Sequence, residues 1–442
     1  MKRTAKFIVM LAVVVAVTIF AGTAAMASDY GAQADSLSEM GLFLGTGNGY
    51  ELDRASTRAE AAVMLVRILG KEAEVKEGAY TDPFTDVPDW AENYVGYMYE
   101  NGLTKGVSDT AFDPGTPCTS QMFTAFVLRA LGYSEEGGDF TYAQAKEFAA
   151  GIGLAAGSDT SGGFLRGDMV AASYSALFLP VNNGGGTILL EKLVADKAVD
   201  ASAAEKYLGY YETYLSYLEA NSAYQDTKNM RIQVESSVDV TMDGVKTSML
   251  QTSDSAIVFS GNDFIMKQET VTDYAGVKME ATTYYADGWL YIDSPEGKYK
   301  YQYPIDVFTA VEQAGLSQVT DPFYMINAIE KTTVSGGVSY KIEYSAAAVN
   351  HILGLLMDQF ADMYDDAMVQ YNALEIVVNF DAFGNLKDIV VSGDVSMTEN
   401  IEGQEVSMDM TMVSTSKILA TGSAVNVVLP ADLDAYAELP LI

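Results

Sequence analysis

Cysteine and histidine are almost absent from this 442-residue sequence, which contains one of each. A single cysteine, Cys118, cannot form an intramolecular disulfide, so burial must hold the fold together, and we expect Cys118 to be a small buried residue. The single histidine, His351, lies in an apolar helical pattern, without a Gly-x-Ser-x-Gly element or a Cys/His cluster at metal-ligand spacing. The sequence therefore nominates no catalytic residue, no metal site and no cofactor.

Positive charge is also scarce. There are 26 Lys and Arg against 60 Asp and Glu, and the formal net charge is -34. A field of this sign repels nucleic acid and anionic membrane surfaces, and it favours solubility. Because no Asp-x-Asp-x-Asp-Gly loop occurs, we interpret the acidity as a solvated surface and not as a calcium site.

One long hydrophobic run opens the chain. Three cations among the first six residues precede an apolar stretch over residues 7–20, and Ala-Met-Ala at 25–27 has the small-x-small pattern of a cleavage site. This predicts a secretory signal peptide over residues 1–27, whose removal would take the net charge from -34 to -37. No later run is apolar for long enough to span a bilayer, so the mature protein is expected to lack a transmembrane segment.

A short motif occurs three times in the first 200 residues. Each copy has Gly-Leu-x-x-Gly, starting at residue 41, 102 or 153, then a polar loop and a helix start. The first glycine can end a helix with a positive φ, and Thr57 and Thr119 stand where an N-cap belongs, with Glu60 completing a capping box. Apolar residues follow at helical spacing, so each copy predicts a helix–loop–helix unit that must bury its stripe against the others. The three helix starts are Thr57-Arg58-Ala59-Glu60, Thr119-Ser120-Gln121-Met122 and Leu165-Arg166-Gly167-Asp168.

The second copy carries the most specific signature. Phe-Thr-Asp-Val-Pro-Asp-Trp-Ala at 84–91, Asn-Gly-Leu at 101–103 and Ala-Phe-Asp-Pro at 111–114 resemble the S-layer homology (SLH) repeat of bacterial surface proteins. The resemblance extends over residues 28–200 as three repeats, at about 28–75, 80–135 and 138–200. Three departures stand out. The first copy lacks the Phe-x-Asp-Val-x-x-x-Trp opening, the second has Ser120 in place of the family's arginine, and the third has a shortened loop.

This resemblance implies an all-α three-repeat module whose grooves bind secondary cell-wall polysaccharide, often carrying a pyruvylated sugar. Arg58 and Arg166 match the motif arginine, while Trp90 and Asp86 match the groove aromatic and acid. An anionic ketal suits a guanidinium with fixed donor geometry, and a sugar face suits an aromatic plate. The alternatives are that Trp90 belongs to the core, that Asp86 caps the following helix, and that the arginines are solvated surface residues.

The pattern changes near residue 200. Tyrosines and leucines at helical spacing from Tyr207 to Leu218 predict a packing surface on a helix. Apolar periodicity predicts further helices at about 305–314, 322–330 and 346–364. Alternating apolar and polar residues predict strands at 234–242, 374–380 and 406–412, with turns at 243–244 and 384–385. Residues 284–291, which contain Asp287-Gly288, and residues 298–301 are typical of hairpins.

A long antiparallel sheet with one apolar face and a few covering helices implies an α+β, half-barrel-like domain over residues 201–442. This half resembles the LolA/LppX-type lipoprotein carriers, in which a curved sheet surrounds helices. The resemblance implies either a cavity for a lipid or other apolar ligand, lined by methionines and aromatics, or a closed core. The alternating face requires only the closed core.

The sequence thus predicts a secreted, non-catalytic protein of the cell wall or cell surface. Residues 28–200 would anchor it non-covalently to secondary cell-wall polysaccharide, and residues 201–442 would form a binding or structural domain. Two alternatives stay open. The protein could be an envelope carrier or sensor of an apolar ligand, or a wall-associated glycan hydrolase, since some pair of its 60 Asp and Glu could lie close together.

Overall fold

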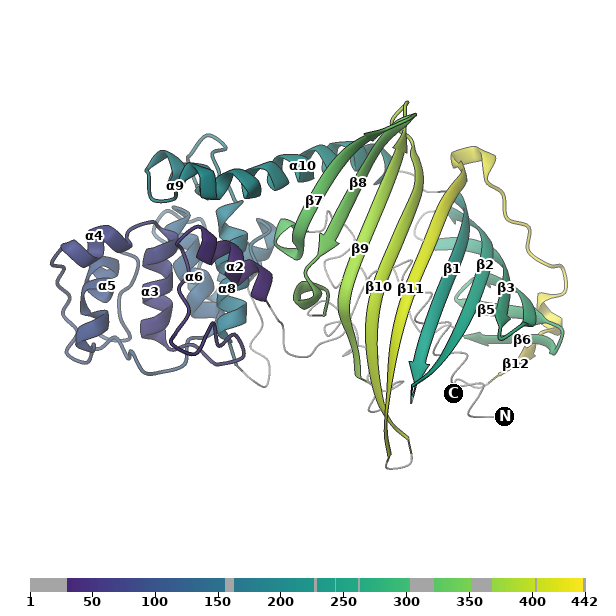
Figure 1. Cartoon of the computed structure of the whole chain (residues 1–442), viewed down its shortest axis with the longest axis horizontal. Helices are drawn as coiled ribbons and strands as arrows, with labels where there is room; N and C mark the ends of the chain where they lie inside the picture. Colours follow the sequence, from purple (N-terminus) through teal and green to yellow (C-terminus); the bar gives the residue numbers. More distant parts are fainter. Residues whose placement is uncertain are drawn as a thin grey trace. The chain divides into compact units, whose positions relative to one another are not determined.

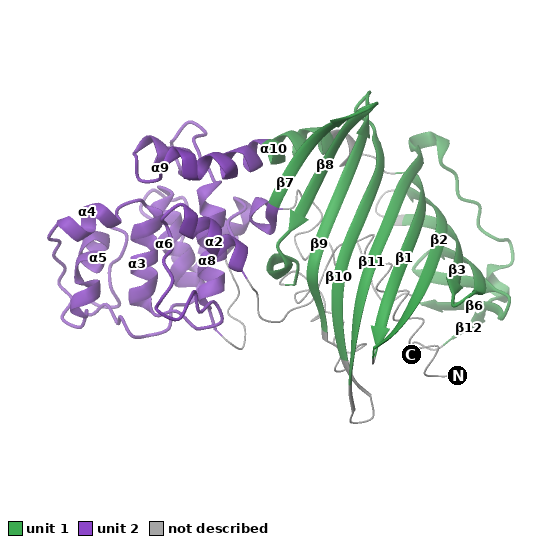
Figure 2. Cartoon of the chain, viewed as in Figure 1, with its two compact units in different colours: residues 1–26, 213–321, 328–442 green, residues 27–212, 322–327 purple. Residues whose placement is uncertain are grey.

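The computed structural model describes residues 30–155, 163–225, 229–242, 244–260, 263–302, 322–350, 368–401 and 404–439 (Figure 1). The chain divides into two compact units (Figure 2). One is mainly helical and comprises Ala27–Glu212 with Pro322–Asn327; the other contains Thr213–Asp321 and Ala328–Ile442 and is mainly β-sheet. The predicted signal peptide, the predicted helix at 305–314, His351 and most of the predicted helix at 346–364 lie outside the described residues.

In the helical unit, the Gly-Leu pair of each motif copy ends a helix, as predicted. Gly41, Gly102 and Gly153 have φ of +73°, +68° and +79°. The leucine after each glycine donates its N–H to the carbonyl five residues earlier, at 2.8 to 2.9 Å, which closes the helix end. Its helices are α2 (Gly31–Glu39), α3 (Arg58–Ile68), α4 (Glu72–Glu77), α5 (Asp89–Glu100), α6 (Ser120–Ala130), α7 (Ala145–Gly151), α8 (Arg166–Leu177), α9 (Leu189–Ala195) and the first half of α10 (Ala201–Gln225).

The helix starts also follow the predicted chemistry. Thr57 Oγ1 accepts from Glu60 N at 3.3 Å while Glu60 Oε2 accepts from Thr57 N at 2.9 Å, a complete capping box for α3. Thr119 Oγ1 caps α6 by accepting from Met122 N at 3.2 Å. At α8 only one of the two capping-box bonds is present. Asp168 accepts the Leu165 N–H at 2.9 Å, but the apolar Leu165 side chain cannot accept a hydrogen bond in return.

The core of the helical unit is shared among the motif copies in a cyclic order. Helix α3 packs against α5, α6 against α7, and α8 against α2, so the second helix of each copy lies on the first helix of the next one. Helices α3, α6 and α8 also contact one another pairwise. Their apolar stripes are fully buried, with Leu65, Phe123 and Val127 each at 0% exposure. Cys118 is also buried in this unit, as predicted.

A short segment from much later in the chain completes the helical unit. Phe323 places its ring 4.4 Å from that of Phe178 and 5.3 Å from that of Tyr211, measured between centroids. Gln33 Nε2 donates to the carbonyl oxygen of Tyr324 at 3.2 Å and to Asn327 Oδ1 at 3.1 Å. Residues 322–327 therefore bury aromatic surface and provide two acceptors for the amide nitrogen of the buried Gln33 within this unit.

This segment corrects one prediction. The expected helix over 322–330 is wrong: the chain forms a single 3-10 turn, η2 (Phe323–Met325), and then enters strand β7 (Ile326–Val334). The apolar residues Phe323, Ile326 and Ile329 are spaced as on a helix and all are buried. However, β-branched residues favour an extended chain, and the following Ser-Gly-Gly turn pairs the segment with the next strand.

The second unit is built on one twelve-stranded sheet in the order β12-β6-β5-β4-β3-β2-β1-β11-β10-β9-β8-β7. The ladders from β6 to β8 are antiparallel, and only the two-residue β12 pairs in parallel, with β6. The remaining strands are β1 (Met230–Met242), β2 (Val245–Ser260), β3 (Asp263–Tyr274), β4 (Val277–Ala286), β5 (Trp289–Ser294), β6 (Gly297–Gln302), β8 (Gly337–Tyr344), β9 (Met368–Asp381), β10 (Leu386–Ile401), β11 (Gln404–Thr421) and β12 (Ala437–Glu438). The strands predicted at 234–242, 374–380 and 406–412 each lie within one of them, and the predicted hairpin segment 284–291 spans the end of β4, a turn and the start of β5.

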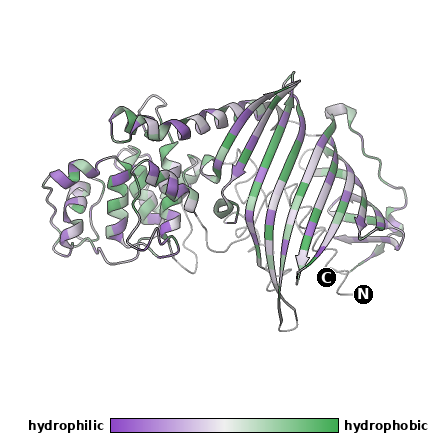
Figure 3. Cartoon of the chain, in the orientation of Figure 1, coloured by the Kyte–Doolittle hydropathy of each residue, from purple (hydrophilic) through white to green (hydrophobic). Residues whose placement is uncertain are grey.

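Register places the apolar residues of the central strands on one face. Met410 in β11 pairs with Val240 in β1 and with Val395 in β10, and all three are buried, whereas the neighbouring Asp409 is exposed. The alternation is visible as bands along β9 to β11 in Figure 3. The hairpin turn at Asp287-Gly288 has φ of +51° and +77°, as a two-residue turn between twisted strands requires.

The tyrosine stripe lies on α10 and is a packing surface, as predicted. Tyr207, Tyr214 and Tyr217 are buried. Tyr217 contacts the Tyr340 ring of β8, with ring centroids 5.6 Å apart, and the Tyr340 hydroxyl lies 2.9 Å from Ser216 Oγ. Among the described residues, no helix has the length and hydropathy of a membrane span.

Candidate functional site

Arg58 begins helix α3 and is buried, with only 4% of its surface exposed. Its Nε donates to the carbonyl oxygen of Phe112 at 2.9 Å, and its guanidinium carbon lies 4.8 Å from the centre of the Phe112 ring. Its Nη1 lies 3.3 Å from the thioether sulfur of Met122. No carboxylate of the described residues forms an ion pair with it. The interpretation of Arg58 as a solvated surface residue is therefore wrong.

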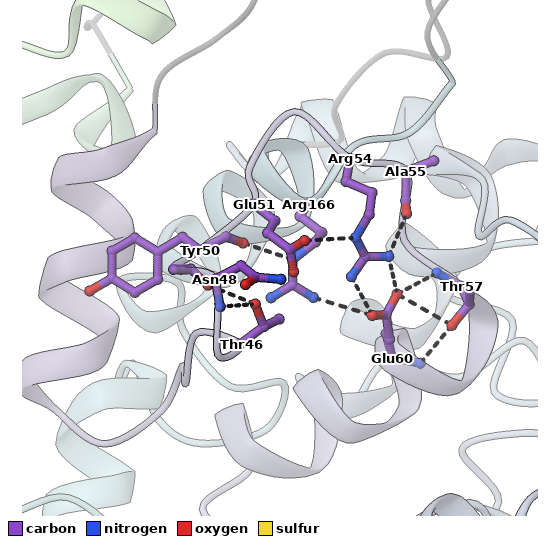
Figure 4. Close-up of polar contacts among 10 residues, drawn as sticks. Thr46, Asn48, Tyr50, Glu51, Arg54, Ala55, Thr57, Glu60 and Arg166 are labelled. Carbon is purple, nitrogen blue, oxygen red and sulfur yellow. Dashed lines mark hydrogen bonds and ion pairs between the residues drawn. The ribbon is translucent and has the colours of Figure 1, made fainter.

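Arg166 begins helix α8 in a very similar setting and is 6% exposed (Figure 4). Its Nε donates to the carbonyl oxygen of Tyr50 at 2.9 Å, and its guanidinium carbon lies 5.3 Å from the Phe43 ring centre. Its Nη1 lies 3.7 Å from Glu60 Oε1, a partner that Arg58 lacks. Burial lowers the pKa of Arg166, and the nearby Glu60 charge opposes this effect. The solvated interpretation is wrong for Arg166 as well.

The two arginines are positioned by equivalent loops. The backbone N–H of Arg58 donates to Thr116 O at 3.0 Å, and that of Arg166 donates to Arg54 O at 2.9 Å. In both cases a loop from another motif copy crosses the start of the helix and offers its carbonyls to the free N–H groups there. The third equivalent helix, α6, begins with Ser120, which is buried and uncharged. The described structure therefore has two arginine sites of this kind.

Glu60 connects the Arg166 site to a second guanidinium (Figure 4). Arg54 donates Nη2 to Glu60 Oε1 at 2.6 Å and Nη1 to Glu60 Oε2 at 3.1 Å, a bidentate pair. Burial raises the pKa of Glu60, but the Arg54 bonds, the Thr57 N–H and the Arg166 charge outweigh it, so the pKa lies below its ordinary value. The side chains of Arg54 and Glu60 are 40% and 23% exposed, so this pair is accessible to solvent.

Asp86 does not cap the helix that follows it, so that alternative is wrong. Its Oδ1 accepts from Phe112 N at 2.9 Å and its Oδ2 from Asp113 N at 2.8 Å. These two backbone bonds, the Phe112 bond first, hold the pKa of Asp86 below its ordinary value, and the nearby positive charge of Arg58 lowers it further. Asp86 thus fixes the loop whose Phe112 carbonyl and ring contact Arg58. It acts on the Arg58 site through that loop.

Trp90 lies in the first turn of α5 and is 57% exposed. The interpretation of Trp90 as a core residue is wrong. An exposed indole at this position leaves a flat apolar face open to a ligand.

The sequence did not indicate a role for Arg54 or for the backbone carbonyls of Tyr50 and Phe112. Their role arises only because loops distant in sequence contact the helix starts in the folded protein. Among the described residues, no group of three or more His, Cys, Asp or Glu could hold a metal ion.

A protein-family model described as "S-layer homology domain" matches residues 83–119, the stretch that contains Asp86, Trp90 and Phe112. The chain contains an S-layer homology domain. The matched segment runs from the loop before α5 to the residue before α6, so it includes the loop that holds Arg58 in place. This SLH match, together with the relatives below, identifies a secreted cell-surface protein.

Two relatives are named as cell-wall or cell-surface proteins, and another is named "Endoglucanase", from Bacillus sp. (strain KSM-635), 37% identical over 79 residues that cover 18% of this chain and 8% of that protein. The chain is 36% identical over 100 residues to a "Middle cell wall protein" of Brevibacillus brevis, covering 22% of this chain and 10% of that protein. It is 32% identical over 161 residues to a "Cell surface protein" of Thermoanaerobacter kivui, covering 34% of this chain and 20% of that protein. The chain thus spans only a small part of the length of these relatives.

Two solved structures resemble the sheet-containing half weakly. A DUF1329 family protein from Desulfovibrio piger matches 50% of this chain and 95% of its own, with 10% identity and a TM-score of 0.18. A putative outer membrane lipoprotein-sorting protein domain from Vibrio parahaemolyticus matches 49% of this chain and 94% of its own, with 8% identity and a TM-score of 0.17. TM-scores this low support no conclusion about ligand or activity.

Proposed function

We propose that this SLH protein is a non-catalytic surface protein that binds secondary cell-wall polysaccharide through three repeats within residues 28–200. The cyclic packing of the helices supports the three-repeat interpretation, since the third copy closes onto the first through α8 and α2. Similarity to a cell wall protein and to a cell surface protein supports a location in the wall. In this proposal the β-rich domain of residues 201–442 is presented at the surface.

The observation that carries the proposal is the state of Arg58. A buried guanidinium without an ion-pair partner is costly, because the more distant Asp86 carboxylate compensates only part of its lost hydration. Of its five N–H donors, one is used by the Phe112 carbonyl and one by a weakly accepting sulfur among the described residues. A sugar that carries a carboxylate, such as a pyruvylated ketal, supplies the missing anion in bidentate geometry.

Trp90 and Asp86 have different roles in this proposal. Trp90 offers the exposed aromatic face against which a sugar ring could lie. Asp86 is a positioning residue, since both carboxylate oxygens are already used by backbone N–H groups. Replacing Asp86 should therefore weaken binding by loosening the Phe112 loop, and the loss should be accompanied by a lower melting temperature.

The test is a comparison of two arginine variants of helix α3 in the full mature chain. Arg58→Ala should weaken binding to purified polysaccharide-bearing walls by about 1.5 to 3 kcal/mol, because a charge-assisted bond is lost. Arg67→Ala is the matched control: it lies on the same helix and is paired with Glu72 at 3.0 Å. Equal affinities of the two variants in a sedimentation assay would refute the role of Arg58.

For residues 201–442 we propose a structural domain whose apolar sheet face forms a closed core. Met408, Met410 and Met412 are all buried at 2% to 4% exposure, as close packing requires. Native mass spectrometry of the purified mature chain should then show no co-purifying apolar molecule. A stoichiometric lipid adduct would instead favour the carrier alternative.

A further inference from the structure

The two arginine sites differ in charge, although their backbone geometry is the same. Arg58 and Arg166 each give Nε to a loop carbonyl at 2.9 Å and lie over an aromatic ring. Glu60, however, lies 3.7 Å from the Arg166 guanidinium and also binds Arg54, so carboxylate charge is already present there. Asp86 is the carboxylate whose charge Arg58 stabilises, but it forms no ion pair with Arg58 among the described residues, and both of its oxygens accept backbone N–H groups of the Phe112 loop.

Resting on the proposed function, we infer that Glu60 makes the two sites select different parts of the polysaccharide. The Arg58 site takes the carboxylate of an acidic sugar, and the Arg166 site takes an uncharged, hydroxyl-bearing sugar. Glu60 is in this sense the specificity-determining residue of the second site.

The physical reason is that an incoming carboxylate at the Arg166 site would meet Glu60. It would have to displace Glu60 from Arg54, where two bonds of 2.6 and 3.1 Å hold it, or accept a like charge nearby. Sugar hydroxyls face no such penalty, because each hydroxyl can donate to a carboxylate oxygen and accept from a guanidinium N–H. The accessible Arg54–Glu60 edge offers both kinds of group side by side.

The decisive experiment combines two protein variants with two forms of the polymer. Polysaccharide released from purified walls is used either native or with its carboxylates reduced to alcohols, and binding to the mature chain is measured by calorimetry. Arg58→Ala should lower the affinity for the native polymer about tenfold or more, and the affinity for the reduced polymer less than about threefold. Arg166→Ala should lower both affinities by the same factor. A loss from Arg166→Ala that disappears on the reduced polymer would overturn the inference.

A second variant tests Glu60 directly and keeps the helix cap. In Glu60→Gln the amide oxygen can still accept the Thr57 N–H, but the negative charge is gone, so Arg54 and Arg166 become available to an anion. We expect a roughly threefold to tenfold higher affinity for the native polymer, with a steeper dependence on salt. Unchanged or lower affinity would contradict the inference.

Glu135→Gln is the matched control, because Glu135 forms a similar bidentate pair with Arg129, at 2.7 and 2.9 Å. It removes the same charge from the protein and should leave the affinity unchanged. The same experiment tests the proposed function separately, because that proposal fails if the unaltered chain does not bind the native polymer. If the chain binds and Arg58→Ala reduces binding while Glu60→Gln behaves like Glu135→Gln, only the present inference fails.

Discussion

The helical unit and the sheet unit bury different kinds of side chain. The helical unit encloses charged groups, including Arg58, Arg166 and Asp168, each held by specific backbone contacts. The central strands of the sheet bury methionines and valines, and their buried polar groups are small hydroxyls such as Ser236 and Ser414, which lie 2.9 Å apart. Burial of a charge needs a reason beyond packing, whereas burial of a methionine does not. This difference directs the search for function to the helical unit.

The largest expected effect is on the sheet, where burial alone stabilises the structure. Met410→Asp would place an unpaired carboxylate on the buried face and should cost about 4 kcal/mol or more. Asp409→Asn, on the exposed face of the same strand, should change stability by less than about 0.5 kcal/mol. Urea unfolding of the mature chain, followed by circular dichroism, measures both. Similar losses would mean that the strand register is wrong.

The next largest effect concerns Phe323, whose position in the chain suggests the sheet but whose contacts lie in the helical unit. Phe323→Ala should cost the helical unit about 3 kcal/mol by removing its ring from Phe178 and Tyr211. Hydrogen exchange should increase in α8 before it increases in β9 to β11. If exchange increases first in the sheet, the assignment of residues 322–327 to the helical unit would be incorrect.

A smaller loss is expected at the helix end of the second motif copy. Gly102 has φ of +68°, and a Cβ placed there would meet no heavy atom within 4 Å. Gly102→Ala should therefore cost only the backbone strain, about 1 to 2 kcal/mol. Gly115→Ala is a useful comparison, because it also has open space but no positive φ, and it should be nearly neutral. Thermal melts of the two variants would isolate the cost of the positive φ, and equal melting temperatures would contradict the assigned backbone strain.

The smallest effect should appear in the pH dependence of stability. The pKa of Glu60 is lowered in the folded protein, so its stabilising contribution is present above the unfolded value of about 4.3 and is lost as the pH falls through the folded value. Glu60→Gln should melt slightly below the unaltered chain at pH 7, and the difference should shrink towards pH 3. A difference that grows on acidification would contradict the assigned ion pairs.

Local signals in the sequence were sufficient for much of the fold. The Thr57 capping box, the positive φ of Gly102 and the turn at Asp287-Gly288 each depend on a few adjacent residues, and all were predicted. The prediction of a helix at 322–330 was wrong because apolar periodicity alone cannot identify the structure that buries the residues. Here the first residues join an aromatic cluster and the later ones form the edge strand β7. The spacing of Phe323, Ile326 and Ile329 suits either arrangement.

The candidate site could be predicted only in part. The repeat identified Arg58 and Arg166, since both occupy the same place at the start of a helix. Their burial and the difference in their charge environments arise from contacts with Phe112 and Tyr50, which are 54 and 116 residues away in sequence. Contacts between residues so far apart in sequence cannot be predicted from composition or motif spacing. Asp86 was identified through the resemblance of residues 84–91 to the SLH repeat, but its role as a support for the Phe112 loop required the structure.

The central claim is that the helical unit holds the protein to the wall through a polysaccharide. The most direct test is to mix the full mature chain with purified walls before and after the polysaccharide has been removed, and to measure the sedimented fraction. We expect strong binding to intact walls, near-complete loss of binding on stripped walls, and competition by released polymer. Undiminished binding to stripped walls would contradict it, because the ligand would then have to be peptidoglycan or another component of the wall.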